Sequence, residues 1–275
     1  MPRSLVANTR LLASLRSIMQ QIISRTPDAR MRRAYDTAPA HLLIIAPTER
    51  ELWTMFSSRA AGIGVSTVGV GRVAADRLKL VLETRRPQVS LSIGFCGALT
   101  PNLATGDIVV SLYASSIQVP DKQMAFDSDY SIAVFNTLTD AGLSPTYGDV
   151  LMVPEPLLKG REKLLHGIQT QSAIVDMESY WIAQESLRVN IPMVSIRVIL
   201  DEMTHELPDL VTAITADGGR NEWKHALRAM LKPSSAGSLL PLAIRSRKAA
   251  ATIKAALQAV IPTLTKNASI RAMYR

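Results

Sequence analysis

One stretch, residues 173–201, constrains the fold of this chain more than any other. It contains two short apolar runs, 173–175 and 192–200, separated by a segment, 178–188, whose apolar residues recur at helical spacing. Short apolar runs, the second rich in valine and isoleucine, are typical of buried strands in parallel sheets. The pattern therefore predicts a strand, a helix and a second strand.

A carboxylate follows each of these two predicted strands. Asp176 and Glu178 come after the first strand, and Asp201 comes after the second. In open α/β sheets, ligands bind beyond the carboxyl ends of the strands. Glu178 and Asp201 are therefore candidate site residues. Acids are also common at helix N-termini, where they accept backbone hydrogen bonds, and capping or a surface position is the simpler expectation for Asp176.

The same alternation of elements recurs upstream and predicts an α/β fold. Parallel or mixed sheets with helices on both faces show this pattern. Strands are expected at 41–46, 66–70, 89–93, 108–112 and 150–153. Helices are expected after Thr48, from Gly71 to 86, at 131–142 and from 156 to about 166, with an irregular loop at 115–130.

Glu51 follows the first predicted strand and admits two interpretations. It stands three residues after Thr48, so it fits the acidic partner of a helix-capping box. Its position also places a third carboxylate at the crevice expected to hold Glu178 and Asp201.

Metals and cofactors are not predicted. The four histidines are scattered, and no paired ligand spacing accompanies the single cysteine. The Gly69-Val70-Gly71 turn is a weak phosphate signal, and no acid follows it at the spacing of a dinucleotide site. One cysteine excludes an internal disulfide and suits a reducing compartment such as the cytoplasm.

Charge divides the chain into three predicted parts. Residues 1–40 hold seven Arg and two Asp, and residues 223–275 hold ten basic residues and no acid. The intervening body, 41–222, is acidic, with 14 basic and 21 acidic residues. Aromatic residues make up only 5% of the chain, so nucleic-acid binding is not expected. Basic amphipathic ends fit contact with the inner surface of an anionic membrane instead.

The two ends leave alternatives open. Residues 1–40 resemble a transit peptide in composition, but a packing helix, a membrane-surface helix and an over-extended start explain them equally. Helices are expected at 222–231 and 243–260, joined by a loop at 233–238. The second of these helices is expected either to pack on the body or to lie on a membrane.

Four segments in order resemble the purine nucleoside phosphorylase and nucleosidase superfamily. They read I-I-A-P-T-E-R-E-L from Ile44, V-G-V-G-R-V-A-A from Val68, S-I-G-F-C-G-A-L-T-P-N-L-A-T-G-D-I-V-V-S from Ser92, and V-D-M-E-S from Val175 followed by I-P-M-V-S-I-R-V-I-L-D, which ends at Asp201. The resemblance implies a three-layer α/β/α sandwich around a mixed, partly barrel-like sheet. It also implies a homo-oligomer that cleaves the N-glycosidic bond of a purine nucleoside such as an adenine nucleoside.

The resemblance assigns a role to each matching residue. Asp201 would contact the purine and assist its protonation, and Glu51 would position the attacking water. The substrate-binding residues would be Met177, Glu178, Phe95, Cys96, Gly97 and Leu157. A carboxylic acid against the base suits this chemistry because a purine leaves readily only when its ring is protonated, and an adjacent carboxylate stabilises the oxocarbenium-like sugar.

Departures from the family pattern favour hydrolysis over phosphorolysis. Ser92 and Phe95 stand where bacterial phosphorylases carry the Arg and Ser that grip phosphate, so the fork that binds phosphate bidentately is missing there. Arg72 and Arg197 are the candidates for a relocated phosphate site. A third alternative is a module that binds a nucleoside or lipid without cleaving it.

Phe95, Leu200 and the segment Met152–Pro154 replace a Ser, a Ser and an S-G-D segment of the methylthioadenosine nucleosidases, which predicts a more apolar pocket. These apolar positions and the basic C-terminus resemble the hopanoid-associated branch of the superfamily. That likeness implies a lipid-linked adenosine as substrate. It would account for basic amphipathic ends on an acidic catalytic body.

Overall fold

A computed structural model describes residues 41–52, 62–207, 211–212 and 236–273. Its strands are β1 (Leu42–Ala46), β2 (Ile63–Thr67), β3 (Val89–Ala98), β4 (Ile108–Ser111), β5 (Tyr113–Ser116), β6 (Gln123–Ala125), β7 (Pro145–Tyr147), β8 (Val150–Met152), β9 (Ile174–Asp176) and β10 (Met193–Asp201). Its helices are α3 (Glu49–Leu52), α4 (Val73–Arg85), α5 (Ser128–Asp140), α6 (Gly160–Thr170), α7 (Ser179–Arg188) and α10 (Ala236–Met273).

The ten strands form one mixed sheet, which confirms the predicted fold class. The main path runs β6-β5-β8-β9-β3-β10-β4-β7, and β1 pairs with β3 and carries β2. Neighbours β1, β2, β3 and β10 run parallel, whereas β4 is antiparallel to β10 and β9 is antiparallel to β3. The strand–helix–strand unit predicted at 173–201 is β9, α7 and β10, each within one residue of its expected bounds.

Strand β3 joins two parts of the sheet along the same edge. Its first residues, 89–92, pair with β1, and its last residues, Gly97 and Ala98, pair with β9. Residues 93–96 lie between these two pairings. Because β1 runs parallel to β3 and β9 runs antiparallel to it, the carboxyl ends of both strands point toward this interval.

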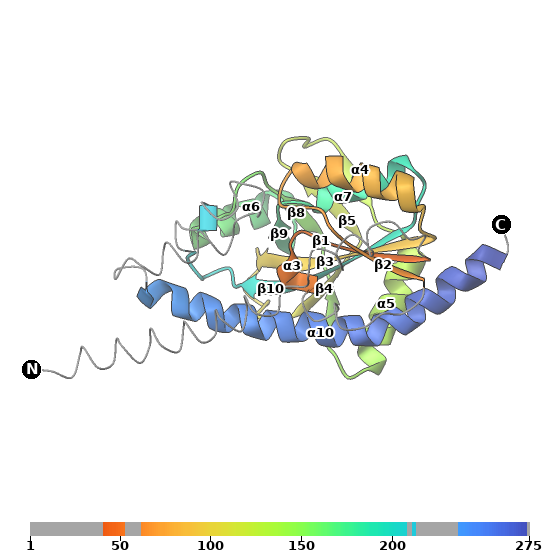
Figure 1. Cartoon of the computed structure of the whole chain (residues 1–275). Helices are drawn as coiled ribbons and strands as arrows, with labels where there is room; N and C mark the ends of the chain where they lie inside the picture. The colour runs from red at the N-terminus through yellow and green to blue at the C-terminus, as the bar shows by residue number, and fades with distance from the viewer. Residues whose placement is uncertain (1–40, 53–61, 208–210, 213–235, 274–275) are drawn as a thin grey trace, which may run out of the picture. The chain divides into compact units, whose positions relative to one another are not determined.

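Helices cover both faces of the sheet and create two hydrophobic cores. One core packs α5 and α10 against β1, β3, β4 and β10, and the other packs α4 and α7 against the opposite face. Figure 1 shows α4 and α7 on one side of the strands and α10 on the other. The inner strands are buried on both faces, which accounts for their continuous apolar sequences.

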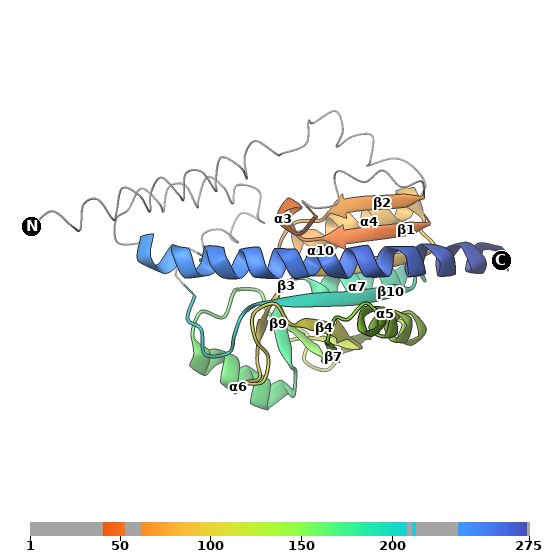
Figure 2. The same cartoon turned by 90° about the horizontal axis from the view of Figure 1, so that it is seen from below.

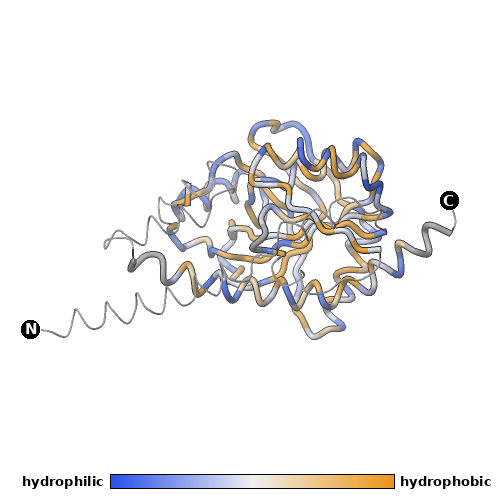
Figure 3. The backbone as a smooth tube through the Cα atoms, in the orientation of Figure 1, coloured by the Kyte–Doolittle hydropathy of each residue, from blue (hydrophilic) through white to orange (hydrophobic). Residues whose placement is uncertain are grey.

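Helix α10 packs its apolar stripe on the sheet. Seven side chains at helical spacing are buried against β1, β3 and β10: Ala249, Ile253, Ala256, Leu257, Val260, Leu264 and Ala268. Figure 2 shows the helix running along these strands, and Figure 3 shows hydrophobic and hydrophilic residues alternating along it. The sequence left open whether this segment packs on the body or lies on a membrane, and in the described residues it packs on the body. The exposed side of the helix carries the basic residues Arg247, Lys248, Lys254 and Lys266.

Three predicted boundaries near the site are wrong. Strand β2 starts at Ile63 rather than Ser66, because its buried positions are the small Gly64 and Ser66, which give no apolar signal. Strand β3 continues through the expected glycine loop to Ala98, because Gly94 and Gly97 pair with β10. Helix α6 spans Gly160–Thr170, later than expected.

The expected loop at 115–130 contains ordered elements. Strand β6 pairs with β5, and α5 begins at Ser128, where Asp127 caps it by accepting a hydrogen bond from Tyr130 N at 3.0 Å. These three- and four-residue strands are too short to show periodicity; β5 is stabilised by pairing with β8, and β6 by pairing with β5.

The C-terminal prediction also needs correction. Helix α10 starts at Ala236, inside the expected 233–238 loop, and it continues past Pro262 because Leu264 and Ala268 extend the buried stripe. The predictions for 1–40 and 222–231 lie outside the described residues, so the boundaries at 40 and 222 stay predictions. Within the described ranges, no helix is long and apolar enough to cross a bilayer.

The packing of α10 predicts that truncating its buried stripe destabilises the whole sheet. Ile253→Ala should lower the free energy of unfolding by about 2–5 kcal/mol, since it leaves a cavity in the core. Lys254→Ala, at the next and exposed position, should change it by less than about 0.5 kcal/mol. Urea denaturation followed by circular dichroism measures both. Equal stability of the two variants would contradict the packing of this helix.

Candidate active site

The carboxyl ends of β1, β9 and β10 bring three acids around residues 94–97 of β3. Glu51 follows β1, Glu178 follows β9, and Asp201 ends β10; all three are about 5% exposed. Glu51 Oε1 lies 3.8 Å from the place of a Cβ at Gly94, and Asp201 Oδ2 lies 3.0 Å from that of Gly97. Three residues of strand separate these positions by roughly 10 Å. Glu51 and Asp201 therefore lie beside one short stretch of β3, and Glu178 lies near enough to Glu51 for the two charges to interact.

Glu51 has the structural role expected of a capping-box acid. Its Oε2 accepts a hydrogen bond from Thr48 N at 3.1 Å and a short one from the Thr48 hydroxyl. This back-bonding orients the carboxylate at the start of α3. Oε1 is the oxygen that lies toward Gly94, so the cap and a position beside β3 are compatible.

Glu178 lies between β9 and the turn before α4. Its Oε1 accepts a hydrogen bond from Gly71 N at 3.0 Å. The φ of Gly71 is +73°, a backbone conformation that favours glycine. Burial, with the Asp176 and Glu51 carboxylates nearby, raises the pKa of Glu178 to about 8. The side chain therefore holds its proton at neutral pH in the unliganded protein.

Asp201 pairs with a buried lysine. Lys163 on α6 donates to Asp201 Oδ2 at 2.5 Å, and the lysine side chain is only 1% exposed. Burial raises the pKa of Asp201, while the Lys163 ammonium opposes that change. The pairing between β10 and β3 shifts register between Ile199 and Asp201. An irregularity of this kind re-aims a side chain at the end of a strand, here beside Gly97.

A second buried ion pair lies beneath Glu178. Arg197 of β10 donates to Asp176 Oδ2 at 2.8 Å, to Ser179 Oγ at 2.8 Å and to Ser92 Oγ at 3.0 Å. Asp176 also accepts from Ser179 N at 3.1 Å. Asp176 therefore caps the start of α7 as expected, but it is buried rather than on the surface.

The two arginines considered for a phosphate site differ in whether their guanidinium groups could reach a phosphate. The Arg197 guanidinium is buried and donates to protein groups through all three of its nitrogens, including Nη1 to Ile196 O at 3.1 Å. The Arg72 guanidinium lies over the ring of Trp181, 4.7 Å from its centroid, and the residue is exposed. Arg72 therefore stays the candidate for an anion contact, next to the turn that binds Glu178.

The other predicted substrate-binding residues lie around the same strand. Phe95 is half-buried against the α10 core, and Cys96 is buried, with burial raising the pKa of its thiol. Met177 is half-buried between Asp176 and Glu178. Leu157 packs on a small cluster that includes Val175, the residue that pairs with Gly97.

Lys163 is the site residue that sequence reasoning missed. It belongs to a helix of mixed composition, 38 residues before Asp201, and no spacing rule connects the two. The Arg197–Asp176 pair carried a clearer signal, because an arginine inside an apolar strand requires a buried partner.

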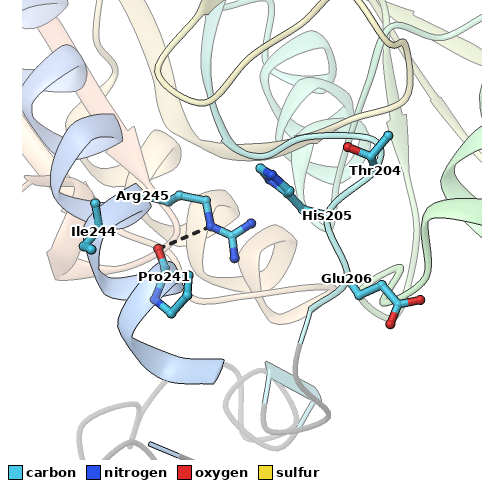
Figure 4. A pocket seen from close by; sticks show the side chains of 6 residues that line it. All are labelled: Thr204, His205, Glu206, Pro241, Ile244 and Arg245. Carbon is cyan, nitrogen blue, oxygen red and sulfur yellow. Dashed lines mark hydrogen bonds between the residues drawn. The ribbon is translucent and has the colours of Figure 1, made fainter. Parts of the chain in front are cut away.

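A cavity of about 490 Å³ opens beside the loop that follows Asp201. Figure 4 shows its lining: Thr204, His205 and Glu206 from that loop, and Pro241, Ile244 and Arg245 from α10. Arg245 Nε donates to Pro241 O at 3.3 Å. Within the described residues, no group of His, Cys, Asp and Glu side chains has the arrangement of a metal site.

The raised pKa of Glu178 predicts a pH-dependent stability. A group whose pKa is about 8 when folded and 4.5 when unfolded binds more protons in the folded state between those values. Stability from this group is thus present below pH 4.5 and is lost as pH rises through 8, by up to about 5 kcal/mol. Glu178→Gln, whose amide oxygen can still accept from Gly71, should lack this slope. Urea titrations of both proteins at pH 5 and pH 8 measure it, and parallel slopes would contradict the assignment.

The Arg197 network predicts a large cost for removing one partner. Arg197→Met leaves the Asp176 carboxylate buried without its cation and should lower the free energy of unfolding by about 3–5 kcal/mol. Arg188→Met provides the matched control, since Arg188 pairs with Glu83 and Glu185 at the surface and should matter much less. Both variants are measured in the same denaturation experiment. If Arg197→Met lowers the free energy of unfolding no more than the control does, a structural role for the pair is excluded.

Comparisons with known proteins agree with this architecture. The futalosine hydrolase of Helicobacter pylori superposes with a TM-score of 0.58 at 11% identity, over 82% of this chain and 99% of that one. A mutant of the H. pylori 5′-methylthioadenosine/S-adenosylhomocysteine nucleosidase, with 5′-methylthioadenosine in its active site, gives 0.56 at 12%, over 70% and 98%. The corresponding nucleosidase of S. pneumoniae gives 0.54 at 17%, over 72% and 99%. At these identities the likeness shows a shared fold.

A family model described as the phosphorylase superfamily matches residues 45–232, which is more than half of the chain. The match includes the last two residues of β1, the glycines of β3, Glu178 after β9 and Asp201 at the end of β10. This chain therefore belongs to the phosphorylase superfamily and is an enzyme of the nucleosidase or phosphorylase kind.

Proposed function

We propose that this enzyme hydrolyses the N-glycosidic bond of a purine nucleoside, an adenine nucleoside above all. The observation that carries the proposal is the placement of Glu51 and Asp201 beside Gly94 and Gly97 of β3, with Glu178 buried close to Glu51 at the end of β9. Structural neighbours include a nucleosidase with 5′-methylthioadenosine in its active site, which supports a substrate of this class. The family and the fold support N-glycosidic cleavage in general; the purine and the use of water are our proposal.

The proposed mechanism divides the reaction among the three acids. Asp201 delivers a proton to the ring of the leaving purine, which accepts the electron pair of the breaking C1′–N bond. Glu178, which holds a proton in the unliganded protein, would hydrogen-bond the ribose hydroxyls and, once ionised in the complex, favour the positive charge that develops on the sugar. Glu51 positions the water and takes its proton as the new C1′–O bond forms. The products are the free base and the sugar.

The hydrogen bonding and exposure of Arg197 and Arg72 favour hydrolysis over phosphorolysis. Arg197 donates from all three of its nitrogens to Asp176, Ser92, Ser179 and Ile196. Of the two arginine candidates only Arg72 is exposed, and a single exposed guanidinium stacked on Trp181 is a weak phosphate grip. A phosphorylase that uses Arg72 is therefore the second candidate function.

The substrate's 5′ substituent is proposed to be apolar, as in a lipid-linked adenosine. Met152 ends β8 beside β9 and Val153 follows it, and both are apolar and fully buried. The cavity beside residues 204–206, in the loop after Asp201, is lined in part by Pro241 and Ile244, and Ile244 is 61% exposed. Pro241 and Ile244 belong to α10, whose exposed side is basic. That side would suit an anionic membrane surface that carries such a substrate.

Substitution of Asp201 tests the mechanism. Asp201→Asn should slow base release by about 10²–10⁴-fold, because the amide cannot supply the proton. Asp140→Asn, at the exposed end of α5, serves as the matched control and should retain full activity. Free base is measured by chromatography, and circular dichroism verifies that both variants fold. Wild-type rates in Asp201→Asn would refute the role of this acid.

The substrate and the acceptor are tested together. Adenosine, inosine, 5′-methylthioadenosine and a 5′-alkyl adenosine are each incubated with and without phosphate. We expect adenine release without phosphate, fastest from the alkyl compound. Release that requires phosphate would establish the phosphorylase alternative, and tight binding without any product would establish a binding module.

A further inference from the structure

Lys163 is a buried cation whose three hydrogen-bond donors are all used. Its Nζ donates to Asp201 Oδ2 at 2.5 Å, to His205 O at 2.8 Å and to Glu202 O at 3.0 Å. An ammonium has three N–H groups, whereas a neutral amine has two. Three acceptors around one nitrogen therefore match the charged form of the lysine. The ionised form of Asp201 neutralises that buried charge, and when Asp201 carries a proton the ammonium keeps the carbonyls of Glu202 and His205 as acceptors.

The charged groups around Asp201 come from four elements. Lys163 reaches it from α6, His205 follows it in the loop with Glu202, Arg245 faces it from α10, and the Cys96 thiol approaches from β3. Thr105 N donates to Glu202 at 3.1 Å and holds that acid as an anion. Burial raises the pKa of the Cys96 thiol, so that group is neutral. In the part of the chain that the structure describes, Lys163 is the cation in direct contact with Asp201.

The lysine also orients the carboxyl group. It binds Oδ2, the oxygen that lies closer to Gly97, while Oδ1 accepts no hydrogen bond from the described residues. The same ammonium holds the carbonyls of Glu202 and His205, so it ties the loop after β10 to α6. One side chain thus determines how Asp201 is turned and which of its oxygens is left for a ligand.

We propose that Lys163 is a positioning residue for the glycosidic reaction: it holds Asp201 through Oδ2, presents Oδ1 to the leaving base and governs the proton affinity of that carboxyl group. The inference rests on the proposed function of Asp201 and extends it to a second residue. No contact between Lys163 and the substrate is required.

The positive charge of Lys163 predicts a specific pH dependence of the reaction rate. A neighbouring cation favours the ionised form of a carboxyl group, typically by 1–3 pH units, while burial opposes this. Asp201 must carry a proton to assist the leaving base, so activity falls on the alkaline side as Asp201 ionises. Without the ammonium, Asp201 should keep its proton to higher pH. The alkaline limb of the kcat/KM profile should then shift to higher pH.

The experiment compares pH–rate profiles of base release for wild type and four variants. Lys163→Met removes the charge, and the limb should rise by about 1–3 pH units; Lys163→Gln replaces it if the methionine variant does not fold. Lys163→Arg keeps the charge, and its limb should stay within half a unit of wild type even if the rate falls. Lys159→Met, at a lysine paired with Glu206 on the surface, should match wild type throughout.

An unchanged alkaline limb in Lys163→Met or Lys163→Gln would overturn the proposal, because a merely structural lysine alters rate or stability without moving it. That result, together with the expected loss in Asp201→Asn, would leave the proposed function standing and reject the inference alone. Absence of base release by the wild type would count against the proposed function instead.

Thermal melting tests the pairing without any turnover. Lys163→Met should lower Tm markedly, and adding Asp201→Asn should recover part of the loss, since both partners are then neutral. Additive losses in the double variant would show that the two groups do not interact as an ion pair, which would overturn the proposal independently of activity.

Discussion

The site depends on one constraint: two strands, β1 and β9, pair with different parts of the same edge of β3. Strand β3 pairs with β1 over residues 89–92 and with β9 over Gly97 and Ala98, so residues 93–96 lie between the two pairings. Because β1 and β9 approach from opposite directions, both end at this interval. Each strand end is followed by an acid, Glu51 or Glu178, and β10 brings Asp201 to the other edge of β3. The crevice therefore follows from strand direction, in agreement with the general place of ligands in α/β sheets.

Concentrating acids at one buried place is costly, and the structure offsets that cost in three ways. Arg197 neutralises Asp176, Lys163 neutralises Asp201, and Glu178 is left with a backbone donor and a pKa raised to about 8. Asp201 and Glu178, the two of these acids that the proposed mechanism uses, thus have different partners. Groups whose environments differ in this way divide acid, base and electrostatic work among themselves. A site for cleaving a glycosidic bond needs this division, because the base must be protonated while the sugar becomes positive.

The C-terminal helix changes how the charge pattern is understood. The sequence separates a basic C-terminus from an acidic body, yet the apolar stripe of α10 completes the core over β1, β3 and β10. Its basic residues lie on the exposed side, and Arg245 lies at the cavity beside Asp201. The segment is thus structural along one side, and it carries basic residues on the other.

Sequence alone determined the α/β class, the unit at 173–201 and the three acids, because buried strands leave apolar runs and the acids stand directly after them. The continuation of β3 through Gly94 and Gly97, and the Lys163–Asp201 pair, were decided by tertiary structure. Glycine in a strand gives no local signal until a neighbouring strand approaches it closely. A lysine 38 residues from its partner becomes a site residue only when α6 folds against the end of β10. Periodicity reports which face of an element is buried, whereas contacts between distant elements depend on how the whole sheet closes.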